Sequence, residues 1–178
     1  IPHPIIGYMG TINSTRLDGE LLYQIISQRP DYSFVFTGPE DDGFRQHRIH
    51  SLKNAYFTGQ KKVDELPAYI TAYDVCINPQ MVNDITDGNY PLKIDEYLAM
   101  GKPTVATSTH TMRHIFADHT HLATNPEEWL SAIDRAVTEA DDKELAKQRI
   151  AFAETHSWGH SVKKIYGIID NFLKEKAT

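Results

Sequence analysis

The sequence predicts an α/β protein built on a doubly wound parallel sheet, with additional helices at the C-terminal end. Short apolar runs, several of them closed by glycine or proline, alternate with segments whose apolar residues recur at helical spacing. Beyond residue 126 only helical patterns remain. Strands that are joined through helices pair in parallel by right-handed crossovers, so helices are expected on both faces of the sheet.

The first half of the chain begins with a strand, Ile5–Met9, which ends at Gly10. Apolar residues from Leu17 to Ile26 then recur at helical spacing and stop before Pro30, which disfavours a helical conformation at the residue before it. Further strands are expected at Ser33–Thr37, Ala55–Thr58 and Asp74–Asn78, and further helices at Arg45–Leu52 and Val63–Ala72.

The second half is centred on a helix that begins near Pro91, whose missing N–H is harmless there, and that stops at a glycine. Leu92, Tyr97 and Leu98 give this helix an apolar side. Trp158 is expected to anchor the last helix in the core, and that helix also carries an apolar stripe that can meet another domain or a membrane surface. The remaining elements are a strand around Val105, an edge strand at His121–Thr124 and helices at Glu127–Ala140, Asp142–Thr155 and Trp158–Lys174.

The composition describes one ordinary globular domain over residues 1–178. The chain has 178 residues, 40% of them hydrophobic and 24% charged, which is enough for a single core. A net charge of −6 argues against a nucleic-acid binder. The single cysteine, Cys76, lies in an apolar run, so no disulfide framework is expected. Because the chain begins at Ile1 rather than at methionine, we expect it to be a piece of a longer polypeptide or a processed chain.

Ligands of doubly wound sheets bind beyond the carboxyl ends of the strands, so the loops that follow the strands are candidate binding segments. Gly10 lets the backbone approach a ligand closely, and Arg16 can bind a phosphate through its planar guanidinium. The first loop has a single glycine, so it is not a dinucleotide fingerprint, and no Walker motif is present. The five loops are Gly10–Arg16, Gly38–Gly43, Thr58–Lys62, Pro79–Pro91 and Ser108–Met112.

Lys93 and Glu96 are three residues apart and share a face of the helix that starts near Pro91. A cation, an anion and unpaired backbone N–H groups then lie together at the positive end of a helix. Such an end suits a phosphate with a hydroxylated group beside it. The alternative interpretation is an ordinary surface ion pair.

A series of short segments occurs in a fixed order along the chain: Gly7–Gly10, Leu17–Asp18, Glu20–Leu22, Arg29–Val35, Thr37–Pro39, Asn54–Gly59, Glu65–Pro67, Tyr73–Val75, Pro91–Lys93, Glu96–Pro103 and Thr155–Trp158. Taken in this order, these segments resemble the second domain of the group 1 glycosyltransferases, which are retaining, nucleotide-sugar-dependent enzymes of the two-domain GT-B fold. The resemblance covers nearly the whole chain and implies a Rossmann-like, donor-binding domain.

The resemblance implies a donor site at eight positions: Gly10, Arg16, Gly59, Gln60, Tyr90, Leu92, Lys93 and Glu96. Gly10, Arg16 and Lys93 would contact the diphosphate, together with the backbone around Tyr90 to Leu92. Gly59 and Gln60 would hold the base, and Glu96 would accept hydrogen bonds from the ribose hydroxyls. The first glutamate of the family's pair falls at Gly88 in this sequence, so Asp84 or Asp87 would have to take its place.

The resemblance further implies a transferase of bacterial polysaccharide biosynthesis, in the cytoplasm or at the inner face of the membrane. Its substrate would be a nucleoside diphosphate-sugar, with no cofactor and no metal, and an N-terminal domain absent from these residues would hold the acceptor. The isolated chain is then expected to bind nucleotide without turnover. A solvated surface is favoured over a metal site for His110, His114, Asp118, His119 and His121, and Asp41–Asp42 is interpreted as turn chemistry.

Two other classes remain open. A sugar-nucleotide epimerase on the same fold would need catalytic acids and a histidine in the linker between its lobes. A non-catalytic receiver-like or scaffold domain would show a cluster of acids after the first strand, where this chain has Gly10-Thr-Ile-Asn.

Overall fold

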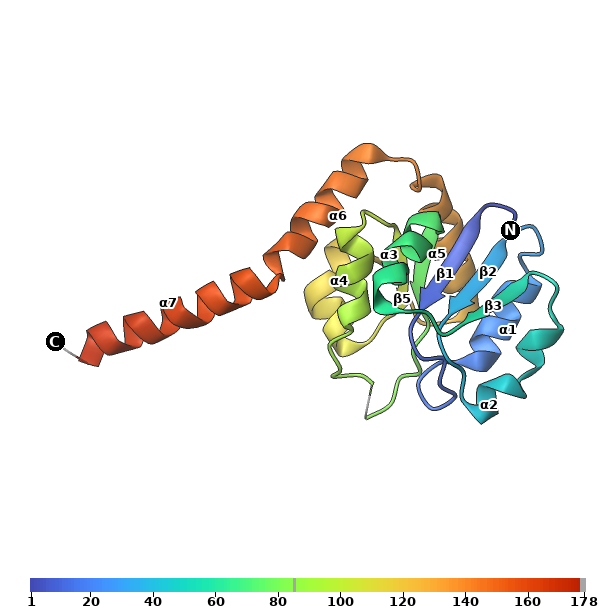
Figure 1. Ribbon diagram of the computed structural model, residues 1–178, viewed down its shortest axis with the longest axis horizontal. Helices are drawn as coiled ribbons and strands as arrows, with labels where there is room; N and C mark the ends of the chain where they lie inside the picture. Colours follow the sequence, from blue (N-terminus) through green and yellow to red (C-terminus); the bar gives the residue numbers. More distant parts are fainter. Residues whose placement is uncertain (85, 177–178) are drawn as a thin grey trace.

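The computed structural model describes residues 1–84 and 86–176 and contains a six-stranded sheet in the order β3-β2-β1-β4-β5-β6 (Figure 1). All neighbouring strands pair in parallel. The predicted doubly wound sheet is therefore confirmed, and the strand order reverses between β1 and β4. The strands are β1 Ile5–Met9, β2 Ser33–Thr37, β3 Ala55–Gly59, β4 Val75–Asn78, β5 Thr104–Thr107 and β6 His121–Ala123.

The helices follow the predicted order, and β6 is an edge strand as expected. The α-helices are α1 Gly19–Ser27, α2 Asp42–Arg45, α3 Leu66–Ala72, α4 Leu92–Ala99, α5 Pro126–Thr138, α6 Lys143–Thr155 and α7 Trp158–Lys176. Shorter helical turns lie at Arg48–Ser51, Val63–Glu65, Met112–Phe116 and Ala117–His119.

The central strand β1 is buried along its whole length, because helices cover both faces of the sheet. Ile6 and Tyr8 belong to one apolar cluster, and Ile5 and Met9 belong to the other. The first cluster contains side chains of α1 and α5, including Leu22, Ile25, Trp129 and Ile133. The second contains side chains of α3, α4 and α6, including Ile70, Ile94, Tyr97 and Ala153.

The prediction of one helix at Arg45–Leu52 is wrong, because two shorter helical elements lie there instead. The Asp41 carboxylate accepts a hydrogen bond from the Phe44 N–H, at 2.8 Å, and so starts α2 three residues earlier than expected. The ring of His47 accepts from the Ile49 N–H and starts a separate helical turn at Arg48. Both ends are set by side-chain caps rather than by apolar spacing.

The segment expected as a loop at Ser108–Met112 is already helical from His110. The Asp87 carboxylate accepts a hydrogen bond from the His110 N–H at 2.7 Å, which satisfies one of the first N–H groups of this turn. The partner lies 23 residues away along the chain, so the local sequence gave no signal for it.

Two predicted core positions are wrong. Trp158 is 84% exposed and Leu92 is 65% exposed, while the buried tryptophan is Trp129 of α5. Trp158 is exposed because α7 extends away from the α/β body (Figure 1), and Leu92 is exposed because it begins α4, where it lines two cavities. None of the described α7 side chains is buried, so its apolar stripe faces outward. Within the described residues, no helix is both long enough and apolar enough to cross a membrane.

Candidate functional site

A cavity of about 460 Å³ lies at the carboxyl ends of β1 and β4, between the loop after β1 and the start of α4. Two of the five candidate loops, Gly10–Arg16 and Pro79–Pro91, contribute to its lining. Five of the eight predicted donor-site positions line it: Gly10, Arg16, Tyr90, Leu92 and Lys93. The lining residues also include Tyr8, Asn13, Gln80 and Asn89.

The loop after β1 packs against the end of β2 and the loop after it through backbone contacts. The Gly10 N–H donates to the Thr37 carbonyl at 2.9 Å, and Gly10 has φ +137°, a conformation that favours glycine. A Cβ atom on Gly38 would lie 2.0 Å from the Gly10 carbonyl oxygen. A side chain on Gly38 would therefore displace the loop at Gly10, whereas a Cβ on Gly10 itself would lie 3.2 Å from Lys93 Nζ.

The rest of this loop is folded by short polar contacts. The Asn13 side chain accepts a hydrogen bond from the Thr15 N–H at 2.8 Å, which turns the chain toward Arg16. Asp41 accepts from the N–H and the hydroxyl of Ser14, at 2.9 and 2.7 Å. These bonds, after the one to the Phe44 N–H, lower the pKa of Asp41, so the acidic pair at Asp41–Asp42 serves the turn as predicted.

The helix α4 is fixed to the end of β1 by Tyr97. Its buried hydroxyl accepts from the Met9 N–H at 2.8 Å and donates to the Met9 carbonyl at 3.3 Å. This contact sets the distance between the start of α4 and the loop at Gly10. Lys93 of α4 is consequently brought over the end of β1.

Lys93 is mostly buried and is held by Tyr8. Its Nζ donates to the Tyr8 hydroxyl at 2.8 Å and lies 4.4 Å from the centre of the Tyr8 ring. The Tyr8 hydroxyl in turn donates to the Thr11 carbonyl at 3.0 Å. Burial lowers the pKa of Lys93 to about 8, with the charge of Arg16 acting in the same direction and that of Glu96 opposing it. The amine is therefore a cation below pH 8, in place beneath the open loop.

Arg16 completes the cationic lining. Its side chain is exposed, and no ion pair of its guanidinium is found among residues 1–84 and 86–176. With Lys93 it gives the cavity two positive groups, whereas no aspartate or glutamate lines the cavity among the described residues. Such a cavity can receive a diphosphate through cations and backbone N–H groups.

Glu96 lies outside this cavity, although it is on the same helix as Lys93. It lines a neighbouring cavity with α6 residues, and Leu92 lines both cavities. Burial raises the pKa of Glu96, and the positive charge of Lys93 partly offsets that rise. Lys93 and Glu96 are thus close enough for their charges to interact, as expected from their spacing, but only Lys93 lines the cavity at Gly10.

Gly59 and Gln60 also lie apart from the main cavity. Gly59 ends β3, two strands from β1, and its carbonyl accepts from the Gly38 N–H at 3.1 Å. Both residues are exposed at the same carboxyl edge as the cavity. The roles predicted for them remain predictions.

The position matching the family's first glutamate, Gly88, faces open space, since a Cβ there would meet no atom within 4 Å. Asp87 is already engaged through its contact with His110, and Asp84 is exposed. The substitution of either aspartate for the missing glutamate remains a prediction.

Tyr8 and Gln80 line the cavity but were not among the predicted site residues. Tyr8 carried a signal in the sequence, because a tyrosine two residues before a strand-ending glycine places its hydroxyl at the carboxyl edge. Gln80 is buried and accepts from the Asn78 amide at 3.1 Å. Its role depends on contacts with the loop after β1, which no local pattern shows.

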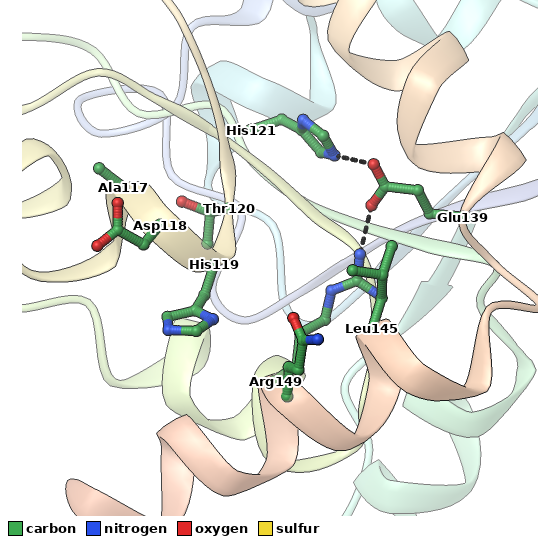
Figure 2. A pocket seen from close by; sticks show the side chains of 9 residues that line it. Ala117, Asp118, His119, Thr120, His121, Glu139, Leu145 and Arg149 are labelled. Carbon is green, nitrogen blue, oxygen red and sulfur yellow. Dashed lines mark hydrogen bonds and ion pairs between the residues drawn. The ribbon is translucent and has the colours of Figure 1, made fainter.

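The histidine-rich segment does not gather around one point. His121 bonds to Glu139 at 3.0 Å, and Figure 2 shows it pointing to that carboxylate. Asp118 and His119 lie elsewhere around this second pocket, which is separate from the cavity at Gly10. His119 stacks on Phe152, with ring centres 4.1 Å apart. Within the part of the chain that the structure describes, no group of three or more His, Cys, Asp or Glu residues could hold a metal ion.

Comparisons with known proteins add a family to this geometry. The sequence profile described as "Glycosyl transferases group 1" matches residues 3–139. A protein of Bacillus subtilis (strain 168), provisionally named teichuronic acid biosynthesis glycosyltransferase TuaH, is 27% identical over 168 residues. The match covers 90% of this chain and 42% of that protein, so the chain spans less than half of its relative's length.

Solved structures share the fold at low identity. Sucrose-phosphate synthase from Thermosynechococcus elongatus superimposes with a TM-score of 0.75 at 19% identity, over 97% of this chain and 46% of that chain. HepE of Anabaena, solved in complex with UDP, superimposes with a TM-score of 0.75 at 14% identity, over 95% of this chain and 49% of that chain.

Proposed function

The chain belongs to the group 1 glycosyl transferases, and from this membership we propose that it is the donor-binding half of a retaining glycosyltransferase. The proposed reaction transfers a sugar from a nucleoside diphosphate-sugar to a glycan, lipid or other acceptor. The observation that carries the proposal is the cavity at the carboxyl edge, where Lys93 and Arg16 flank the open backbone at Gly10. Support also comes from a structural neighbour, HepE of Anabaena, which was solved with UDP.

In this proposal the protein acts mainly by electrostatics. When the bond between the sugar and the diphosphate breaks, negative charge grows on the departing phosphate. Lys93 is already held in place by Tyr8, so it can stabilise this charge without reorganising. Arg16 is exposed and can close onto the diphosphate from the other side. The proposal assigns no cofactor and no metal ion to this step.

The acceptor is proposed to bind to a further domain outside these 178 residues. Closure of two domains over the cavity would exclude water that would otherwise hydrolyse the donor. The chain alone is therefore expected to bind nucleotide weakly and to transfer no sugar. We also propose a cytoplasmic location at the membrane face, supported by the exposed apolar side of α7 and its lysines.

Calorimetric titration tests the donor site directly. The chain is titrated with UDP, GDP, ADP and TDP, and with the four corresponding nucleosides. One diphosphate should bind measurably, more tightly than its nucleoside, and the difference should shrink as salt screens Lys93 and Arg16. Lys93→Met should remove most of the preference for the diphosphate. Equal affinity for nucleoside and diphosphate at low salt would contradict the proposal.

A further inference from the structure

A hydrogen-bonded network of three side chains connects the wall of the donor cavity with the junction between α6 and α7. The Tyr90 hydroxyl donates to Asp95 Oδ2 at 2.6 Å, and Asp95 Oδ1 lies 2.9 Å from His156 Nδ1. Tyr90 lines the donor cavity, Asp95 is in the first turn of α4, and His156 ends α6. One carboxylate therefore joins two groups that lie 66 residues apart in the sequence, at positions 90 and 156.

Tyr90 and His156, the two outer members of this network, are also held by packing. The Tyr90 ring lies 5.5 Å from Phe116, and the His156 ring lies 4.6 Å from Phe152 and 5.8 Å from Phe116, all measured between ring centres. Phe116 is fully buried. The imidazole has little freedom to turn, so it can keep the Asp95 carboxylate in one orientation.

Tyr90 gains from such support because ring packing covers it only in part. It lies in the connection between β4 and α4, and 38% of it is exposed. Burial, followed by the hydrogen bond to Asp95 and the charge of that carboxylate, raises the pKa of Tyr90. The phenol consequently stays protonated and remains a donor to Asp95 at neutral pH.

We propose that Asp95 is a positioning residue, which holds Tyr90 in the wall of the donor cavity while His156 orients Asp95 from the end of α6, next to α7. The proposal rests on the donor site described above. It gives α7 a physical connection to nucleotide binding, because movement of the α6–α7 junction would move His156 and release Tyr90. Asp95 itself does not line the cavity and acts only through Tyr90.

The first measurement needs no ligand. Thermal unfolding is recorded for Tyr90→Phe, Asp95→Ala and the double variant. Because both single changes break the same bond, the fall in Tm of the double variant should be clearly smaller than the sum of the two single falls. Additive falls in Tm would show that Tyr90 and Asp95 are not coupled. They would overturn the positioning role of Asp95, whether or not the chain binds nucleotide.

The second measurement is the Kd for UDP, or for whichever diphosphate binds. Tyr90→Phe and Asp95→Ala should each weaken binding by about threefold to tenfold, the range of one hydrogen bond. The double variant should be little worse than either. Asp95→Asn keeps an acceptor for the phenol, so it should recover part of the affinity that Asp95→Ala loses.

A matched control exists elsewhere in the chain. Tyr32 donates to Asp134 at 3.1 Å, and Arg29 is the third member, so the same chemistry recurs far from the cavity. Tyr32→Phe should lower Tm as Tyr90→Phe does but leave the Kd unchanged. Equal Kd values for wild type and Tyr90→Phe would overturn the positioning role. If wild type binds no diphosphate, the proposed function fails. The Tm values of the single and double variants then still decide whether Asp95 holds Tyr90.

Discussion

Lys93 is the residue in which burial, charge and position combine most directly. A lysine enclosed by Tyr8, the loop at Gly10 and α4 loses much of its hydration, and its pKa falls to about 8. A diphosphate in the cavity would return a counter-charge to the amine and raise its pKa again. Binding of the nucleotide is therefore expected to be coupled to uptake of a proton.

The first prediction concerns this coupling. Below pH 8 Lys93 is already charged, whereas above pH 8 the free protein must bind a proton to hold the diphosphate. The affinity for the diphosphate should be constant from pH 7 to about 7.5 and should fall as pH rises from 8 to 9.5. Calorimetry at several pH values measures it, and Lys93→Met should show weak binding that does not change over this range. A wild-type affinity that stays constant up to pH 9.5 would contradict the prediction.

The second prediction concerns Glu96. Leu92 lines both the cavity at Lys93 and the cavity at Glu96, so we expect a nucleotide whose diphosphate lies at Lys93 to place its ribose toward Glu96 by extending past Leu92. Glu96→Gln should then weaken UDP binding by about 1–3 kcal/mol, as when a charged hydrogen-bond acceptor is lost. The variant should also bind UDP and 2′-deoxy-UDP alike, whereas wild type should prefer UDP. If Glu96→Gln binds UDP as tightly as wild type does, the ribose is elsewhere.

At the scale of elements, α6 is docked onto the body by a charged contact as well as by apolar side chains. Arg149 is 5% exposed and pairs with Glu139, which also bonds to His121 at 3.0 Å (Figure 2). Burial lowers the pKa of Arg149, while Glu139 opposes that shift. The pair spans from the end of α5 to the middle of α6, so it fixes one helix against the next.

The third prediction follows from that burial. Glu139→Ala leaves the Arg149 charge buried without its main partner and should lower the free energy of unfolding by about 3 kcal/mol. Urea denaturation followed by circular dichroism measures this change. Glu144→Ala is the control, because the pair it forms with Lys147 is exposed and should contribute less than about 0.5 kcal/mol. Similar losses in the two variants would show that the Arg149 contact does not hold α6.

At the scale of the whole molecule, the α/β body and α7 differ in how they are stabilised. Two apolar clusters fill both faces of the sheet, whereas α7 contributes no buried side chain among its described residues. Its large exposed apolar residues are Trp158, Val162, Ile165, Tyr166, Ile168, Ile169, Phe172 and Leu173. An amphipathic helix in this position needs a partner surface, and the fold of the body does not depend on it.

The fourth prediction tests this independence. A chain that ends at Ser157 keeps His156 but loses α7, and its free energy of unfolding should change by less than about 1 kcal/mol. It should also associate less with itself, which sedimentation velocity measures. A chain that ends at Glu139 is the contrasting variant: it removes the buried Arg149 and Ala153 and should be strongly destabilised. If the chain that ends at Ser157 no longer unfolds cooperatively, the fold of the body depends on α7 and the prediction is wrong.

The sequence alone predicted the parallel sheet and the edge at which the site forms. Strands such as β1 and β2 are marked by their own apolar runs, and in a parallel sheet their following loops must lie at one edge. Five of the eight predicted positions meet there because they belong to two such loops or to the first turn of the helix that follows the second loop. The resemblance to the family rested on the order of the motifs, and the match to residues 3–139 confirmed it.

The tertiary structure decided which side chains meet. Lys93 joins Tyr8 across 85 residues and His156 joins Asp95 across 61, so no local pattern could show either contact. Helical spacing placed Lys93 and Glu96 on one side of α4, but packing against β1 drew only Lys93 into the cavity. The sequence predicts Trp158 in the core, yet burial depends on what packs against a helix, and none of the described α7 side chains is buried. Periodicity reports which face of an element is apolar, and only the fold decides what that face meets.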